Sequence, residues 1–375
     1  MSAEGAVIHR AKVLLVDHTT QPGGAELGLP RIARETDHDL RLVFLEPLSD
    51  NLPFDVGTDI VAPPEKLRPL AQLKYLRRVL RKNADRIVVS NTLRAAFLVA
   101  LLKPRAQVHV QELHDGVSKD SLSRSKRLIT SYVFSRVDRV MPNSRWTAST
   151  VPPRYQHLLT QPIYSPSGTT GTEGEARSSL QGQTVRLLSL SRVVEWKGIH
   201  VILDALAQLD HELTPKSVKL TIAGGTIMGP STYIDDLHRA AGDLSFEVSF
   251  VPHQKDVRPL LLSHDVLVHA SIRPEPYGQV IVQGLAYGLC VVASRDGGPG
   301  ELVVDGVSGL LHDAGDPTSL SRSLKRAIVD PALRSALSSS GRVRAREFSD
   351  ARCTALFDEA LVGPQQGTAR ATLPA

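Results

Sequence analysis

Glu275 stands at the centre of the stretch whose residue types are best suited to chemistry, residues 273–280. An apolar helix and an apolar strand follow it, and a turn at Gly297-Gly298 then opens a further helix. The first backbone amides of a helix have no partner within the helix, so a helix start is a site for phosphate. A carboxylate beside such a start suits sugar hydroxyls rather than a second anion. The segment therefore indicates a ligand in which a sugar is joined to a diphosphate.

Two cations follow another apolar strand, which we predict at residues 185–190. Arg192 comes directly after this strand, and Lys197 comes five residues later, just before Gly198. Ligands of open α/β sheets bind beyond the carboxyl ends of the strands. An arginine fork and a lysine point charge complement each other on a diphosphate. Two solvated surface cations are the alternative, but the presence of Glu275 downstream favours the phosphate role.

A glycine pair lies between a predicted strand at residues 12–17 and a predicted helix at 25–35. Gly23-Gly24 is placed where a phosphate-cradling turn would lie, although it does not spell the three-glycine dinucleotide fingerprint and also suits an ordinary turn. Pro30 within the helix predicts a kink or a late start.

Two sequence motifs contain histidines that are candidate site residues. His114 follows a predicted strand at residues 107–112, where it can hydrogen-bond a substrate hydroxyl or be a lone histidine without such a role. Asp37-His38-Asp39 spells the two-aspartate pattern of metal-dependent sugar transferases, but it follows a helix instead of ending an apolar strand. We therefore expect a solvated loop there and no metal site.

Strand-like apolar runs alternate with helix-length amphipathic segments along the whole chain, which predicts an α/β protein with parallel sheets. The remaining strands are predicted at residues 41–46, 86–90, 138–142, 217–223, 246–251, 265–270, 290–294 and 309–312. The remaining helices of the first half are predicted at residues 65–83, 92–103 and 122–136.

Turn formers without periodicity at residues 152–184 divide this pattern into two doubly wound domains. We predict a first domain at residues 1–160, a linker at 161–184, a second domain at 185–345 and a frayed tail at 363–375.

Composition excludes several classes of protein. The chain has 375 residues, 42% of them hydrophobic, and two cysteines, which offer no disulfide framework and suit a reducing cytoplasm. The first residues lack the plan of a signal peptide. The longest apolar run, residues 95–102, is far below the roughly 20 residues that cross a bilayer.

Basic residues concentrate between positions 60 and 140, with 17 Lys/Arg against 6 Asp/Glu. Within this part, the segment 66–83 is a basic amphipathic helix, which is suited to an anionic membrane surface but equally to an ordinary surface helix whose apolar stripe faces the sheet. Nucleic acid is not expected as a partner, because no aromatic residues interleave with the basic ones.

Taken together, these motifs resemble the family-four retaining glycosyltransferases, over about residues 12–345. The resemblance implies two Rossmann-like domains that face a cleft, the architecture called GT-B, with a helix at 346–362 returning to the first domain. It implies a nucleotide-diphosphate sugar as donor substrate, with neither cofactor nor metal.

The resemblance also implies roles for single residues. Arg192 and Lys197 would neutralise the donor diphosphate, Glu275 would bind hydroxyls of the donor sugar, and His114 would touch the transferred sugar. The other donor-binding residues that it implies are Gly23, Gly24, Tyr277, Gly278, Gln279, Val280 and Gln283.

Gln283 is a departure from the family, which has a second glutamate at this position that usually holds the nucleotide ribose. A neutral acceptor forms a weaker hydrogen bond than a charged one, so donor binding should be about tenfold weaker.

We therefore expect a cytoplasmic retaining glycosyltransferase, peripheral at the inner face of the membrane if the basic helix meets lipid. It would move a hexose-type sugar to a glycan or lipid-linked acceptor in cell-envelope polysaccharide or glycolipid synthesis. The alternatives are a GT-B sugar-nucleotide epimerase and a catalytically silent partner subunit that binds nucleotide sugar or a sister transferase.

Overall fold

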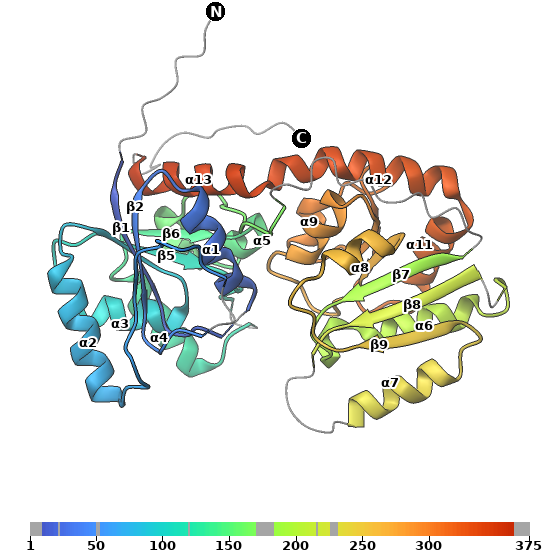
Figure 1. Ribbon diagram of the computed structural model, residues 1–375, viewed down its shortest axis with the longest axis horizontal. Coiled ribbons are helices and arrows are strands. Elements are labelled where there is room, and N and C mark those ends of the chain that lie inside the picture. Colours follow the sequence, from blue (N-terminus) through green and yellow to red (C-terminus); the bar gives the residue numbers. More distant parts are fainter. Residues whose placement is uncertain are drawn as a thin grey trace, which may run out of the picture. The chain divides into compact units, whose positions relative to one another are not determined.

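The computed structural model describes residues 10–21, 23–49, 53–118, 121–169, 184–214, 217–225 and 232–363, which fold into two compact units (Figure 1). Unit 1 takes in the described residues up to Pro166 and those from Asp350 onward, and unit 2 takes in those between Ser167 and Ser349. Most of the predicted linker and the predicted frayed tail lie outside the described residues.

Unit 1 is built on one parallel sheet with the strand order β3-β2-β1-β4-β5-β6. Its strands are continuous apolar runs because both faces of the sheet are covered. The strands are β1 (Lys12–Asp17), β2 (Asp39–Phe44), β3 (Ile60–Val61), β4 (Ile87–Ser90), β5 (His109–Leu113) and β6 (Arg139–Pro142).

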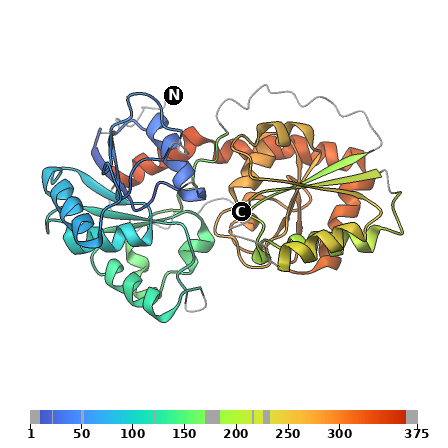
Figure 2. The same cartoon turned by 60° about the horizontal axis from the view of Figure 1, so that its bottom comes forward.

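Helices cover both faces of this sheet (Figure 2). Leu29 of α1 and Phe357 of α13 pack with Leu15 on one face, and Figure 1 shows α13, in red, beside α1. Leu76 of α2 and Val99 of α3 pack on the other face. The helices are α1 (Gly24–Glu35), α2 (Pro69–Lys82), α3 (Leu93–Leu102), α4 (Arg124–Phe134), α5 (Arg145–Ser149), the 3-10 helix η1 (Pro153–Leu158) and α13 (Asp350–Val362).

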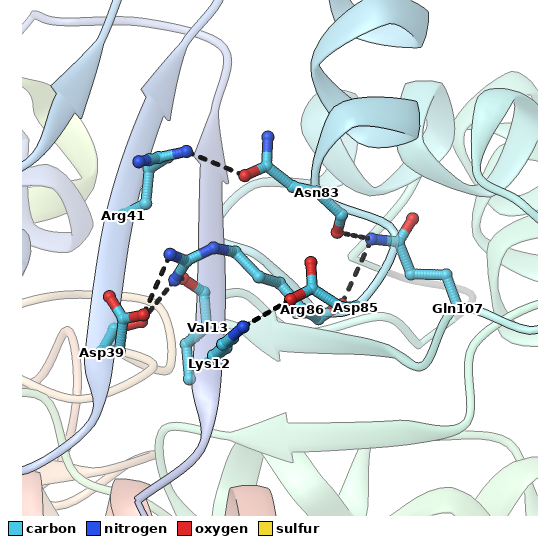
Figure 3. A network of polar contacts seen from close by, with 8 residues as sticks. All are labelled: Lys12, Val13, Asp39, Arg41, Asn83, Asp85, Arg86 and Gln107. Carbon is cyan, nitrogen blue, oxygen red and sulfur yellow. Dashed lines mark hydrogen bonds and ion pairs between the residues drawn. The ribbon is translucent and has the colours of Figure 1, made fainter.

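Polar side chains tie together the amino ends of the strands of unit 1 (Figure 3). The Arg86 guanidinium donates to the backbone oxygen of Asp39 at 2.7 Å and to its carboxylate at 3.0 Å. Lys12 pairs with Asp85 at 2.8 Å, and Gln107 donates to two backbone oxygens of the loop before β4. This edge therefore serves the fold and leaves the opposite, carboxyl edge for a site.

The expectation of a solvated loop at Asp37-His38-Asp39 is confirmed for Asp37, which is exposed, and wrong for His38 and Asp39. Asp39 is the first residue of β2, two residues before the predicted start of that strand. His38 is buried, and its Nε2 lies 3.2 Å from the backbone oxygen of Asp358. The difference at His38 arises because α13, which is distant in sequence, packs over this residue and removes it from water.

Unit 2 repeats the architecture with a parallel sheet in the order β12-β11-β10-β7-β8-β9. Its strands are β7 (Val185–Leu190), β8 (Val218–Ala223), β9 (Glu247–Val251), β10 (Val266–His269), β11 (Cys290–Ser294) and β12 (Leu310–His312). Its helices are η2 (Glu195–Lys197), α6 (Ile199–Leu209), α7 (Thr232–Gly242), α8 (Arg258–Ser263), α9 (Gln279–Ala286), α10 (Pro299–Leu302), α11 (Pro317–Val329), α12 (Pro331–Ala345) and η4 (Arg346–Phe348).

Both sheets have the same doubly wound order. Counted within its own unit, each reads 3-2-1-4-5-6, and the order reverses between β1 and β4 in unit 1 and between β7 and β10 in unit 2. Doubly wound sheets bind ligands beyond the carboxyl ends of the strands at this reversal. Within the described residues, no helix is long and apolar enough to span a bilayer.

Candidate functional site

The loops that follow β7 and β10 meet at the strand-order reversal of unit 2. The close approach depends on Gly198, whose φ of +68° lies in the left-handed region and whose position would place a Cβ 1.9 Å from the backbone oxygen of Ala270. The amide of Ile272 donates to the backbone oxygen of Trp196 at 2.9 Å. The loop of η2 is thereby fixed against the end of β10, which delivers Lys197 to this edge.

Lys197 and Glu275 form a nearly buried ion pair. The Nζ atom of Lys197 lies 2.5 Å from Oε2 of Glu275, and the two side chains expose 12% and 14% of their surface. The same ammonium lies 4.1 Å from the ring centroid of Trp196, within reach of a cation–π interaction. Two residues that are 78 positions apart in sequence and that were predicted separately are thus in contact.

Two polar side chains, those of Ser271 and His269, hold the carboxylate of Glu275 in place. Ser271 donates its hydroxyl to Oε2 of Glu275 at 2.9 Å, and Nε2 of His269 lies 3.1 Å from Ser271 and 3.5 Å from Glu275. Burial would raise the pKa of Glu275, but Lys197 and His269 outweigh it and hold this pKa well below its usual range. Glu275 is therefore ionised at neutral pH and offers acceptors only.

The backbone of Glu275 packs on the glycine turn before α10. The amide of Gly298 donates to the backbone oxygen of Glu275 at 2.8 Å. A Cβ at Gly297 would lie 2.2 Å from the same oxygen, and the φ of Gly297 is +89°. The turn therefore positions Glu275, and because the Gly298 amide is occupied and α10 has only four residues, this amide is not available to a phosphate.

Arg192 is exposed beyond the end of β7. Its guanidinium carbon lies 6.0 Å from the ring centroid of Trp196. Within the described residues no ion pair or side-chain hydrogen bond engages this guanidinium, so its donors remain available to a ligand.

The predicted donor-binding residues after Glu275 form the start of α9. Gly278 precedes the helix with a φ of +98°, a conformation that favours glycine, and Gln279 and Val280 form the first turn. Tyr277 is buried, and its hydroxyl lies 3.4 Å from Oγ of Ser167. This eight-residue helix therefore begins soon after Glu275 in the chain. The strand before it, β10, is the neighbour of β7, which precedes Lys197.

Gln283 is engaged within unit 2. Its Nε2 donates to the backbone oxygen of Ser167 at 2.7 Å. A glutamate here would lack the N–H donor and would set a carboxylate against that oxygen. The glutamine thus anchors the segment that enters unit 2.

Unit 1 places Gly23 and Gly24 at the start of α1, where the carboxylate of Glu26 folds back onto the turn. A Cβ at Gly23 would lie 2.4 Å from Oε2 of Glu26, and the backbone amides of Gly23 and Glu26 act to lower the pKa of this carboxyl. Burial and Asp17 raise the pKa of Glu26. A diphosphate at this turn would therefore meet the Glu26 carboxyl.

His114 follows β5 at the carboxyl edge of unit 1, as the sequence predicts. Its Nε2 lies 2.8 Å from Oδ1 of Asn91, and burial lowers its pKa against the opposing effect of Asp115 and Asp17. His114 is therefore a neutral ring held in a fixed orientation.

Sequence reasoning missed His269, Ser271 and Asn91. Each lies at or just after the carboxyl end of a strand that borders a strand-order reversal. That position is the signal that would have found them, because the residues form no motif. Among the described residues, no cluster of three or more His, Cys, Asp or Glu side chains is arranged to hold a metal ion.

The comparison with protein families matches residues 173–344 to the family model of glycosyl transferases group 1. The lipopolysaccharide core biosynthesis glycosyltransferase LpsE of Rhizobium meliloti (strain 1021) is 36% identical over 157 residues, which span 41% of this chain and 43% of the relative. The human alpha-1,3/1,6-mannosyltransferase ALG2 is 25% identical over 236 residues, 58% of this chain and 56% of the relative. The alignments thus span about half the length of these relatives.

Solved structures resemble the chain over nearly its whole length. The Anabaena protein HepE, crystallised with UDP and glucose, superposes with a TM-score of 0.77 at 24% identity, covering 95% of this chain and 100% of its own. WaaG, a glycosyltransferase involved in lipopolysaccharide biosynthesis, superposes with a TM-score of 0.69 at 16% identity and covers 94% of this chain and 100% of its own. These likenesses confirm the predicted GT-B fold.

Proposed function

We propose, from the premise that residues 173–344 match the family model of glycosyl transferases group 1, that the chain is a retaining glycosyltransferase. It moves a hexose-type sugar from a nucleotide-diphosphate donor to a glycan or glycolipid acceptor, in cell-envelope polysaccharide or glycolipid synthesis. The observation that carries the proposal is the nearly buried Lys197–Glu275 pair at the strand-order reversal, together with the guanidinium of Arg192, which no ion pair or side-chain hydrogen bond engages within the described residues.

The donor fits this arrangement by charge. An ammonium has three N–H donors; one of Lys197 points to Glu275, and the others, with the Arg192 fork, suit the diphosphate. The ionised Glu275 accepts from hydroxyls of the donor sugar. The complexes of HepE with UDP and with UDP-glucose support a donor of this class.

The chemistry that we propose is electrostatic. Arg192 and Lys197 oppose the negative charge that develops on the departing diphosphate, which lowers the barrier to its departure. Glu275 is held by Lys197 and by the Ser271 hydroxyl, so it is a poor nucleophile. Attack by the acceptor from the face of the leaving group then accounts for retention, with no metal ion required.

The helix α2 has an apolar stripe and a basic face, and the basic face is evidence for where in the cell the protein acts. Leu76, Val79 and Leu80 of this helix are buried against the sheet, while Leu70 is 75% exposed. Its apolar stripe is therefore occupied by the core of unit 1. The exposed basic side chains are Lys74, Arg77, Arg78, Arg81 and Lys82.

We propose that this basic face holds a cytoplasmic enzyme peripherally at anionic lipid, at about 1 kcal/mol per cation near the surface. Sedimentation with vesicles of neutral lipid, with and without anionic phosphatidylglycerol, tests the contact. Arg77→Glu with Arg78→Glu should abolish a preference for anionic vesicles, while Arg124→Glu with Lys126→Glu on α4 is the matched control. Equal sedimentation with both vesicle types would refute membrane contact.

A binding screen against UDP-, GDP- and ADP-sugars tests the transferase proposal. One nucleotide class should bind saturably, and Lys197→Ala and Glu275→Ala should each weaken that binding by about tenfold or more. Lys219→Ala is the control, because this lysine belongs to an exposed pair elsewhere in unit 2. No binding to any class would favour a silent partner subunit that binds a sister transferase, and donor rearrangement without an acceptor would favour the epimerase.

A further inference from the structure

The indole ring of Trp196 contacts both cations of the proposed donor site. Nζ of Lys197 lies 4.1 Å from the ring centroid, and the guanidinium carbon of Arg192 lies 6.0 Å from it. Both distances are within reach of a cation–π interaction, in which the face of an aromatic ring attracts a positive charge. The ring is therefore a contact that the two cations share.

The turn that carries this ring is tied to two neighbouring loops of unit 2. The backbone oxygen of Trp196 accepts from the amide of Ile272, in the loop after β10, at 2.9 Å. The amide of Val193 donates to the backbone oxygen of Gly225, in the loop after β8, at 3.0 Å. Because the turn is held on two sides, the partly buried ring has a defined place at the carboxyl edge of the sheet.

The ammonium of Lys197 has two attractive partners. Its Nζ lies 2.5 Å from Oε2 of Glu275, and the side chain is 12% exposed. A single ion pair leaves the flexible four-carbon side chain of a lysine free to turn about that contact. The ring of Trp196 attracts the same charge from a second group, so two contacts define where the ammonium stands.

The guanidinium of Arg192 depends more strongly on the ring. Arg192 is exposed, and within the described residues no ion pair or side-chain hydrogen bond engages it. Ordering a long, free side chain when a ligand binds costs conformational entropy. Contact with Trp196 restricts the side chain beforehand, so less entropy is lost on binding. Glu195 of the same turn forms no ion pair in the part of the chain that the structure describes, so it does not draw the guanidinium away.

We propose that Trp196 is a positioning residue of the donor site. Its ring holds the Arg192 guanidinium and the Lys197 ammonium so that both can bind one diphosphate. The ring acts through the two cations and makes no contact with the diphosphate itself. The inference rests on the proposed function, because it takes these cations as the groups that bind the donor diphosphate.

Titration calorimetry on the full chain tests the proposal, with inorganic pyrophosphate, UDP, GDP and ADP as the probes. Arg77→Glu with Arg78→Glu is the background, so that the basic face of α2 does not bind the probes. Trp196→Leu should weaken the binding of pyrophosphate and of the preferred nucleotide by about tenfold, because leucine has no aromatic face. Tyr132→Leu, which removes a ring 5.4 Å from the Arg136 guanidinium in unit 1, is the control and should have no effect.

An aromatic replacement separates positioning from packing. Trp196→Phe keeps an aromatic face that attracts cations less strongly than indole, so it should retain more affinity than Trp196→Leu. Equal losses in the two variants would show that the ring serves only to fill space and would overturn the proposal. Melting curves confirm that each variant folds.

Double variants assign the effect to the cations. With Lys197→Met in place, one of the two cations is absent, so Trp196→Leu should weaken diphosphate binding by about threefold instead of tenfold. The same should hold with Arg192→Met in place. A tenfold loss that persists in both backgrounds would show that the ring does not act through the cations.

The fluorescence of Trp196 gives a readout that needs no ligand. The chain has two tryptophans, so Trp146→Phe leaves Trp196 as the sole emitter. Charges beside an indole ring shift its emission, so Lys197→Met and Arg192→Met should each change the emission of the unliganded protein. Lys219→Met, in an exposed pair elsewhere in unit 2, should not. Emission that ignores both cations would contradict their contact with the ring.

Failure of this inference is distinct from failure of the proposed function. Nucleotide binding that Trp196→Leu leaves unchanged would overturn the role of the ring and leave the donor site intact. Pyrophosphate binding that Trp196→Leu weakens, without binding of any nucleotide, would keep the role of the ring and overturn the nucleotide-diphosphate donor. No binding of any probe would overturn both.

Discussion

Replacement of Lys197 by Met tests whether the pair with Glu275 stabilises unit 2. The side chains are 12% and 14% exposed, and the charged atoms are 2.5 Å apart. Removal of one partner from a buried ion pair costs about 3–5 kcal/mol, because the other charge is left uncompensated. Ser271 would still donate to Glu275. We therefore expect a loss in the free energy of unfolding at the lower end of that range, about 3 kcal/mol.

A double-mutant cycle isolates the interaction from other effects of the substitution. Glu275→Gln removes the charge that Lys197→Met leaves behind, so the double variant should lose less than the sum of the two single losses. The difference should be about 1–3 kcal/mol. The same cycle at the exposed pair Lys219–Glu247 is the control and should give less than about 1 kcal/mol.

Denaturant unfolding followed by tryptophan fluorescence is the assay. The chain has two tryptophans, Trp146 in unit 1 and Trp196 in unit 2, beside Lys197. A Trp146→Phe background therefore leaves a reporter for unit 2 alone.

The depressed pKa of Glu275 gives the cycle a second readout. An acid whose folded pKa lies below its unfolded value of 4.5 adds stability above that value and loses it as pH falls toward the folded pKa. Lys197→Met should reduce the amount of stability that the protein loses as pH falls. Strict additivity of the cycle, or a Lys197→Met protein within about 0.5 kcal/mol of wild type, would refute the reasoning.

Three further predictions concern single side chains. Burial and a neighbouring carboxylate raise the pKa of Glu112 from 4.5 to about 8. Between these pH values the folded chain keeps a proton that the unfolded chain has released, so stability falls as pH rises. Glu112→Gln should flatten this fall in melting temperature, and an unchanged slope would contradict the prediction. Asp358→Ala removes the acceptor of the Thr36 hydroxyl at 2.7 Å and should cost about 1–3 kcal/mol, with faster hydrogen exchange in α13; unaltered exchange would count against an anchoring role. Gln283→Glu sets a carboxylate against the backbone oxygen of Ser167 and should lower the melting temperature more than Gln283→Met, whereas the reverse order would show that the contact is not stabilising.

Most of the fold can be predicted from the sequence, because strands buried on both faces have unbroken apolar sequences. The strand β7 at Val185–Leu190 lies where it is predicted, and so does β11 at Cys290–Ser294. The strand β3 has only two residues, too few to form a pattern. Pro30 lies inside α1, which runs from Gly24 to Glu35 with no late start.

The candidate site is predictable in part. Lys197, Glu275 and His114 lie at carboxyl ends of strands, a position that the chain order reveals. The contact between Lys197 and Glu275 is not predictable, because it depends on the register of two loops set by Gly198 against Ala270. The contacts of Ser271 and His269 with Glu275 are equally unpredictable, since single serines and histidines recur throughout the chain.

The placement of α13 in unit 1 affects the order in which the protein can fold as it leaves the ribosome. Unit 1 begins with the first strands to be synthesised, yet its core includes Phe357 and Leu361, which are made after all of unit 2. Unit 2, between Ser167 and Ser349, is continuous in the chain. We therefore expect unit 2 to complete its folding first, while the sheet of unit 1 waits for α13 to cover its exposed apolar face.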